Sequence, residues 1–157
     1  MAAGAAALVV SAAKQRGLRW DAPRLKAALQ GSARYIPKLA AHEQGAGLVQ
    51  VGAAIELLEK LQTARTVTIM SRAPVRTALS HLLAVPNEGV GLYEREGWKA
   101  GDSGERTITL TRTSGPPEPM AFTLRWLDND GTFGSASSVV LPLGRPTPVP
   151  VSIAAKE

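Results

Sequence analysis

Cysteine is absent from the 157-residue sequence, which excludes disulfides, thiolate zinc sites and a cysteine nucleophile. Aromatic residues are sparse, at 4% of the chain. A membrane-spanning helix needs about 18 to 20 apolar residues, and the uncharged apolar run Met1–Ala13 is shorter than this. No signal peptide is expected, because the first basic residues, Lys14 and Arg16, follow the apolar stretch instead of preceding it.

The composition is typical of a globular protein, with 45% hydrophobic and 20% charged residues. A net charge of +5 raises the question of an acidic partner such as nucleic acid. The charges are dispersed, however: residues 1–62 hold eight Lys and Arg against four Asp and Glu, and residues 63–157 hold ten against nine. We therefore expect neither nucleic acid nor a membrane as a partner, and the compartment stays open between cytoplasmic and secreted.

The first third of the chain has helical spacing. Met1–Arg16 is rich in Ala and Leu and lacks Pro, which predicts a helix. This helix has no polar stripe, so we expect all of its faces to be buried in a larger body. Asp21 is a suitable N-cap for a second helix that ends at Gly31, and apolar residues at helical spacing predict a third helix over Val51–Leu61.

Beyond Thr66 the apolar residues alternate, which predicts strands. The alternating sets are Val67 and Ile69; Ile108 and Leu110; Phe122, Leu124 and Trp126; Val139, Leu141 and Leu143; and Val149, Val151 and Ile153. Turn residues separate the later sets at 101–104, 115–119, 128–131 and 144–148. No helical pattern lies between the strands after Val90, so the spacing favours an antiparallel β-sandwich over βαβ units. The predicted fold class is α+β.

Two short segments have some features of ligand sites. Gly45–Gly47 with Gly52 lacks the G-x-G-x-x-G spacing of a dinucleotide site, so a tight turn is the plainer interpretation. Asp128–Gly131 resembles part of a calcium loop, but the earlier Asp and the closing Glu are missing. We therefore expect a hairpin turn there.

His42 and His81 are the only histidines, and neither has a carboxylate or a second histidine at helical ligand spacing. Neither lies beside a nucleophile motif, and the sequence contains no G-x-S-x-G. The sequence therefore predicts no catalytic residue, no cofactor-binding residue, no metal ligand and no cofactor for this chain.

The remaining candidate surface combines two tryptophans with basic residues. They are Trp98 and Trp126, with Arg95, Lys99 and Arg125 close by in the sequence. Such a surface would stack bases of single-stranded nucleic acid or the rings of a carbohydrate. The alternative is sandwich core, because the strand that carries Trp126 has two more apolar residues on the same face. We favour the core.

Three segments, in order, resemble the subtilisin-like serine proteases. Ala3–Leu8 is similar to the buried helix after the nucleophile, in the pattern G-T-S-x-A-x-P-x-x-A-G-A-A-A-L. Leu25–Leu29 with Ser32-Ala33 resembles the next helix and its L-x-x-T-A ending. Gly45–Val51 with Ala53-Ala54 is similar to the G-x-G-L-V-N-V-x-A-A segment that closes the catalytic domain.

Gly89–Glu96 further resembles the tripeptidyl peptidase II branch, in which a G-I-Y-L-R stretch opens a β-sandwich appended to the protease. The resemblance implies three parts. Residues 1–62 would be the C-terminal helices of a subtilisin-like catalytic domain, residues 63–88 a connecting segment, and residues 89–157 a partial β-sandwich domain.

The family's nucleophilic serine would lie ahead of Met1 in this register, and its aspartate, histidine and oxyanion asparagine lie further upstream. No catalytic residue can therefore be assigned to a position here. The resemblance implies a C-terminal fragment of a serine peptidase that is not catalytic alone. Its partner would be the missing upstream protease segment or a second copy, and a peptide would be the substrate only of the complete enzyme. The alternative is a non-enzymatic interaction module with a β-sandwich binding surface.

Overall fold

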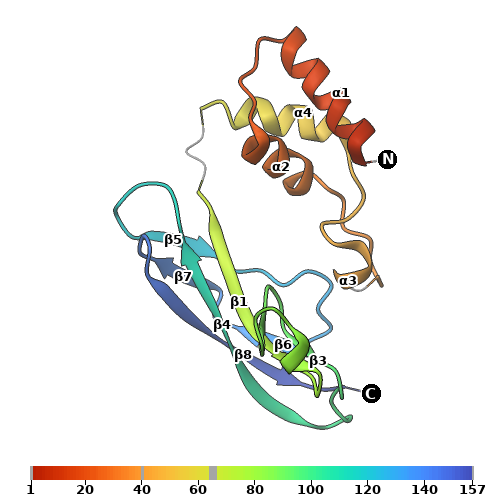
Figure 1. The fold of residues 1–157 in the computed structure, drawn as a ribbon, viewed down its shortest axis with the longest axis vertical. Coiled ribbons are helices and arrows are strands. Elements are labelled where there is room, and N and C mark those ends of the chain that lie inside the picture. The colour runs from red at the N-terminus through yellow and green to blue at the C-terminus, as the bar shows by residue number, and fades with distance from the viewer. Residues whose placement is uncertain (1, 40, 64–66, 157) are drawn as a thin grey trace. The chain divides into compact units, whose positions relative to one another are not determined.

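The computed structural model describes residues 2–39, 41–63 and 67–156, with the main chain alone for Ala41 and His42. The chain divides into two compact units, Met1–Thr66 and Val67–Glu157, here called the helical unit and the β unit (Figure 1). Each is described by itself. Over the described residues, no helix has both the length and the apolar character needed to cross a membrane.

The helical unit contains the three predicted helices and one short helix that the sequence pattern did not predict. These are α1 (Ala2–Gln15), α2 (Ala22–Gly31), α3 (Ala41–Gln44) and α4 (Val51–Lys60). Asp21 caps α2 as expected, because its Oδ1 accepts a hydrogen bond from the Arg24 main-chain nitrogen at 2.8 Å. A four-residue helix such as α3 is too short to give an apolar period.

The core of the helical unit lies where α1, α2 and α4 meet. Its fully buried residues are Val9, Ala13, Ala28, Ala54 and Leu58. On α1, only Val9 and Ala13 are buried, and Leu8 keeps 60% of its surface exposed. Within this unit, therefore, α1 is covered along one side only.

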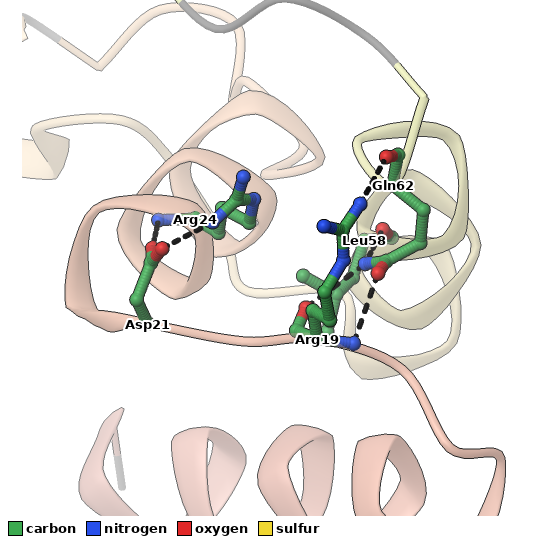
Figure 2. A network of polar contacts seen from close by, with 5 residues as sticks. All are labelled: Arg19, Asp21, Arg24, Leu58 and Gln62. Atoms are coloured by element: carbon green, nitrogen blue, oxygen red, sulfur yellow. Dashed lines mark hydrogen bonds and ion pairs between the residues drawn. The ribbon is translucent and has the colours of Figure 1, made fainter.

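Hydrogen bonds of Gln62 connect the end of α4 to the loop between α1 and α2 (Figure 2). Its Oε1 accepts a hydrogen bond from the Arg19 main-chain nitrogen at 2.9 Å. Its Nε2 donates to the Arg19 carbonyl and to the Leu58 carbonyl, both at 2.9 Å. One half-buried side chain thus joins segments that are 43 residues apart in sequence.

The β unit is built mainly from antiparallel strands. They are β1 (Ile69–Arg76), β2 (Glu88–Gly89), β3 (Tyr93–Glu94), β4 (Ser103–Arg112), β5 (Met120–Thr123), β6 (Phe133–Ser135), β7 (Ser138–Leu141) and β8 (Pro146–Ala154), with the 3-10 helix η1 (Ser80–Leu82) after β1. The main sheet has the order β2-β1-β4-β8-β6, β3 pairs in parallel with β1, and β5 pairs with β7. Together with the helical unit, this gives the predicted α+β class.

The alternation in β8 has the predicted effect. Val149, Val151 and Ile153 are buried on one face of the main sheet, here called its apolar face. In the register of β4 with β8, Ile108 lies opposite Val149, and so β4 adds apolar residues to the same face.

The turn predicted at 144–148 is shorter than expected, because Pro146 and Pro148 already belong to β8. Proline lacks the N–H that a ladder needs and is tolerated at a strand edge without a partner. β8 pairs with β6 only over Val151–Ile153, so the side of β8 away from β4 is unpaired at the prolines.

The prediction that Trp126 belongs to the sandwich core is wrong, since 39% of its surface is exposed. β5 ends at Thr123, and Leu124 leaves the strand with its nitrogen bonded to the Ser137 carbonyl at 2.8 Å. Phe122 and Leu124 are half-buried. Because the strand stops before Trp126, the alternation no longer determines which way this side chain faces.

Candidate functional site

An apolar cleft of about 290 Å³ lies in the β unit, and we call it the Trp126 cleft. Its lining residues come from both the main sheet and the loops around it: Ser71, Val90, Ile108, Leu110, Leu124, Arg125, Trp126, Ser135, Val149 and Val151. The volume is close to the lower limit of small-ligand sites, which is about 300 Å³.

The floor of the Trp126 cleft is the apolar face of the main sheet. Ile108 and Leu110 come from β4, and Val149 and Val151 come from β8. They face the cleft together because alternate residues of a strand point to the same side. β4 pairs with β8 over Ser103–Thr111 and with β1 over Thr109–Arg112, so at Leu110 it has a neighbouring strand on both sides.

Trp126 is held in place by two contacts from β6. Its ring stacks on Phe133 with 5.4 Å between ring centroids and 19° between planes. Its Nε1 donates a hydrogen bond to Ser135 Oγ at 3.2 Å. These contacts fix the orientation of a large aromatic side chain that stays partly open to solvent.

The polar groups of the cleft differ in whether they already have partners. Ser71 Oγ donates to the Val90 carbonyl at 2.8 Å, and Ser135 Oγ donates to the Ala136 carbonyl at 3.1 Å. Arg125 is exposed, and no hydrogen bond or ion pair joins its side chain to another residue that the structure describes. Its guanidinium is therefore the available donor of the lining.

A second cleft, of about 170 Å³, is lined by Trp98, Ile153 and Phe133. Phe133 is the residue that also stacks on Trp126. The guanidinium carbon of Arg106 lies over the Trp98 ring, 4.9 Å from the ring centroid, as in a cation–π contact. Beneath it, Gly104 leaves room for the ring, because a Cβ there would lie 2.7 Å from a ring carbon.

The structure therefore brings some of the predicted surface together and separates the rest. Trp126 and Arg125 line the first cleft, and Trp98 lines the second, with Phe133 between the two tryptophans. Arg95 and Lys99 are exposed and line neither cleft.

A third hollow, of about 340 Å³, is more polar and involves Arg72, Glu88 and Thr109. Arg72 and Glu88 form an ion pair at 2.9 Å. Because these charges already neutralise each other, this hollow offers less to a ligand than the Trp126 cleft does.

Asp128–Gly131 forms a turn as expected, but it is not a hairpin, since the strands on either side of it, β5 and β6, do not pair. Asn129 Oδ1 accepts from the nitrogens of Gly131 and Phe133, and Asp130 Oδ1 accepts from the Thr132 nitrogen. Hydrogen bonds from Thr132, first of its side chain and then of its main chain, lower the pKa of Asp130.

Gly45 and Gly47 lie in a tight turn with φ of 60° and 108°. At Gly47 a Cβ would lie 2.4 Å from the Arg34 carbonyl oxygen. Arg34 pairs there with Leu48, with both main-chain hydrogen bonds at 2.8 Å. The glycine allows this close approach of two main-chain segments.

The histidines lie in different units. His81 is exposed in η1, and His42 belongs to α3, where its side chain is outside the described residues. The described residues contain no group of three or more His, Asp or Glu that could hold a metal ion.

Sequence reasoning missed Phe133 and Ser135, which hold Trp126 in place. β6 has only three residues, Phe133–Ser135, and this is too short for an alternation to be recognised. The available signal was the aromatic residue directly after the turn at Gly131, in a chain with few aromatics.

Residues 70–157 match the model of a known family, the Ig-like domain in actinomycete serine proteases. The match covers more than half of the chain and spans nearly the whole β unit. Neither a curated protein nor a solved structure matches the chain significantly.

Proposed function

The chain belongs to the family of Ig-like domains in actinomycete serine proteases, and on that premise we propose that it is a non-catalytic accessory part of a serine peptidase. More specifically, it is the C-terminal fragment of a subtilisin-like enzyme close to the tripeptidyl peptidase II branch. The observation that carries this proposal is the family match over residues 70–157, which follows the subtilisin-like segments in the order that such an enzyme would have.

In this proposal residues 1–62 are the last helices of the catalytic domain, residues 63–88 connect the two parts, and residues 89–157 form most of the β-sandwich domain. β1 joins the main sheet from within the connecting segment. The character of α1 supports this arrangement, because Leu8 is exposed on a helix without a polar face. Such a helix is suited to burial against further protein.

The reaction of the complete enzyme would be peptide-bond hydrolysis through an acyl-enzyme. The triad and the oxyanion asparagine would come from the upstream protease segment. This chain would complete the body of that domain through α1, α2 and α4, and would add the Ig-like domain. A second copy of the chain would cover α1 only when the upstream segment is missing.

A serine-directed phosphonate probe tests the proposal. The full chain alone should not be labelled, because the activated nucleophile is missing. Co-expression with the in-frame upstream coding region should give a labelled complex that contains both polypeptides. Stoichiometric labelling of the chain alone, or an upstream region that encodes no G-T-S-x-A-x-P segment, would contradict the fragment proposal.

The second candidate function is a non-enzymatic interaction module. The observation in its favour is the Trp126 cleft, which combines an apolar floor with Arg125, whose guanidinium is paired with none of the described residues. Ligand binding by a chain that associates with no protease segment would support the module over the fragment.

A further inference from the structure

The floor of the Trp126 cleft favours a ligand that carries an apolar group. Ile108, Leu110, Val149 and Val151 form this floor, and burial of an apolar side chain there is favourable because it removes apolar surface from water. The volume of about 290 Å³ suits one side chain and its immediate neighbours, not an extended polymer segment.

The cleft does not offer a sheet edge to a ligand. β4 pairs with β8 over Ser103–Thr111 and with β1 over Thr109–Arg112. β8 is paired with β4 along its length and with β6 at Val151. The floor is a face of the sheet and presents side chains, whereas strand addition needs the main-chain groups of a sheet edge. A ligand on this floor must therefore be recognised by side chains.

The polar lining favours an anion. The hydroxyl hydrogens of Ser71 and Ser135 are already donated to main-chain carbonyls. The Arg125 guanidinium is not paired with any residue in the described part of the chain. Its planar set of N–H donors matches a carboxylate in two parallel hydrogen bonds. The complementary ligand is thus an apolar group with a carboxylate a short distance away.

We infer that the Trp126 cleft binds the carboxyl-terminal residue of a peptide, with a large apolar side chain on the β4 and β8 floor and the terminal carboxylate on Arg125. This inference rests on the proposed function in one respect. Each hydrolysis by a peptidase produces a peptide with a new carboxyl terminus, and so an accessory domain of such an enzyme meets this ligand.

Titration calorimetry on the full chain tests the inference with three acetylated peptides. The probes are acetyl-Ala-Ala-Leu with a free carboxylate, the same peptide with a terminal amide, and acetyl-Ala-Ala-Ala with a free carboxylate. We expect the amide to bind about threefold to fivefold more weakly, as for an exposed ion pair. The peptide ending in Ala should bind at least about tenfold more weakly because it buries less apolar surface.

Variants separate the charge from general effects on the fold. Arg125→Gln should lose the preference for the free carboxylate over the amide, and Arg125→Lys should keep part of it. Arg145→Gln is the matched control, because Arg145 is an exposed arginine of the same unit that does not line the cleft. Its preference should equal that of the unmodified chain, and higher salt should weaken only the carboxylate component.

Three results would overturn the inference: no binding of any probe, equal binding of the acid and the amide, or equal binding of hexanoate, which would indicate any small amphiphile. Failure here leaves the peptidase proposal intact, since that proposal is tested by probe labelling in the co-expressed complex. Conversely, specific peptide binding by a chain that never associates with a protease segment would refute only the proposed function.

Discussion

The Nε of Arg112 donates a hydrogen bond to the carbonyl of Leu141 at 3.1 Å, and both residues are fully buried. The other guanidinium nitrogens donate to the carbonyls of Ser114, Pro116 and Glu118. Arg112 thus joins the end of β4 to β7 and to the loop after β4. A buried cation is accommodated here by main-chain dipoles, without a carboxylate among these four partners.

Replacing Arg112 should destabilise the β unit strongly. Arg112→Met keeps much of the apolar length but leaves up to four carbonyls without donors. The bond to Leu141 is buried and the other three are partly buried, and a buried unsatisfied group costs about 1 to 3 kcal/mol. We expect a loss of about 3 kcal/mol or more in the free energy of unfolding, measured by urea denaturation. Arg145→Met at an exposed site should change it by about 0.5 kcal/mol or less, and equal effects of the two variants would contradict the assigned role.

Trp126→Ala should cost only about 1 to 2 kcal/mol of stability. The variant loses the stacking on Phe133 and one hydrogen bond to Ser135, each worth about 0.5 to 1.5 kcal/mol. Leu141→Ala, in the buried core, should cost about 2 to 5 kcal/mol. Chemical denaturation of both variants tests this. If Trp126→Ala lowers the free energy of unfolding by more than Leu141→Ala does, Trp126 belongs to the core after all.

Gln62→Ala should destabilise the helical unit where α4 contacts the loop between α1 and α2. It removes three side-chain hydrogen bonds, two with Arg19 and one with Leu58, at a net cost of about 1 to 2 kcal/mol, since these bonds are solvent-exposed or half-buried. Amide exchange at Arg19 should become faster. Gln30→Ala is the control, because Gln30 is exposed at the end of α2, and its amide exchange pattern should match that of the unmodified chain.

Asp130 should titrate below the ordinary aspartate value of 3.8, because Thr132 stabilises its charged form. A pKa that is lower in the folded state stabilises the fold above the unfolded value, and this contribution is lost as the pH falls through the folded pKa. We therefore expect the turn to be insensitive to pH near neutrality and to loosen only in acid. An NMR titration of the Thr132 amide tests this, with Asp130→Asn expected to abolish the shift; a midpoint above 3.8 would contradict it.

Leu8→Lys should reduce self-association of the chain without unfolding the helical unit. Leu8 is 60% exposed, whereas Val9 beside it is buried, so the change places a charge on the uncovered side of α1. Sedimentation should detect fewer oligomers than in the unmodified chain. Val9→Lys is the contrasting variant and should unfold the helical unit, because it places a charge in the core. If the unmodified chain is already monomeric, the prediction that α1 causes self-association is contradicted.

The elements that could be predicted from the sequence are those whose stabilising pattern is local. Asp21 caps α2, the apolar spacing predicts α4, and the alternation of Val149, Val151 and Ile153 gives the buried face of β8. In each case the pattern has the period of the element that it forms, 3.6 residues or two. These are properties of neighbouring residues, and a single sequence contains them.

The residues that form the cleft could not be predicted from the sequence, because they come together only in the folded β unit. Trp126 is exposed because β5 ends at Thr123 and because Phe133 and Ser135 hold the ring from another strand. Arg112 is buried because the carbonyl of Leu141 in β7 and three carbonyls of the loop after β4 accept its hydrogen bonds. Both outcomes depend on contacts between different strands and loops of the β unit, and no helix or strand period encodes such contacts.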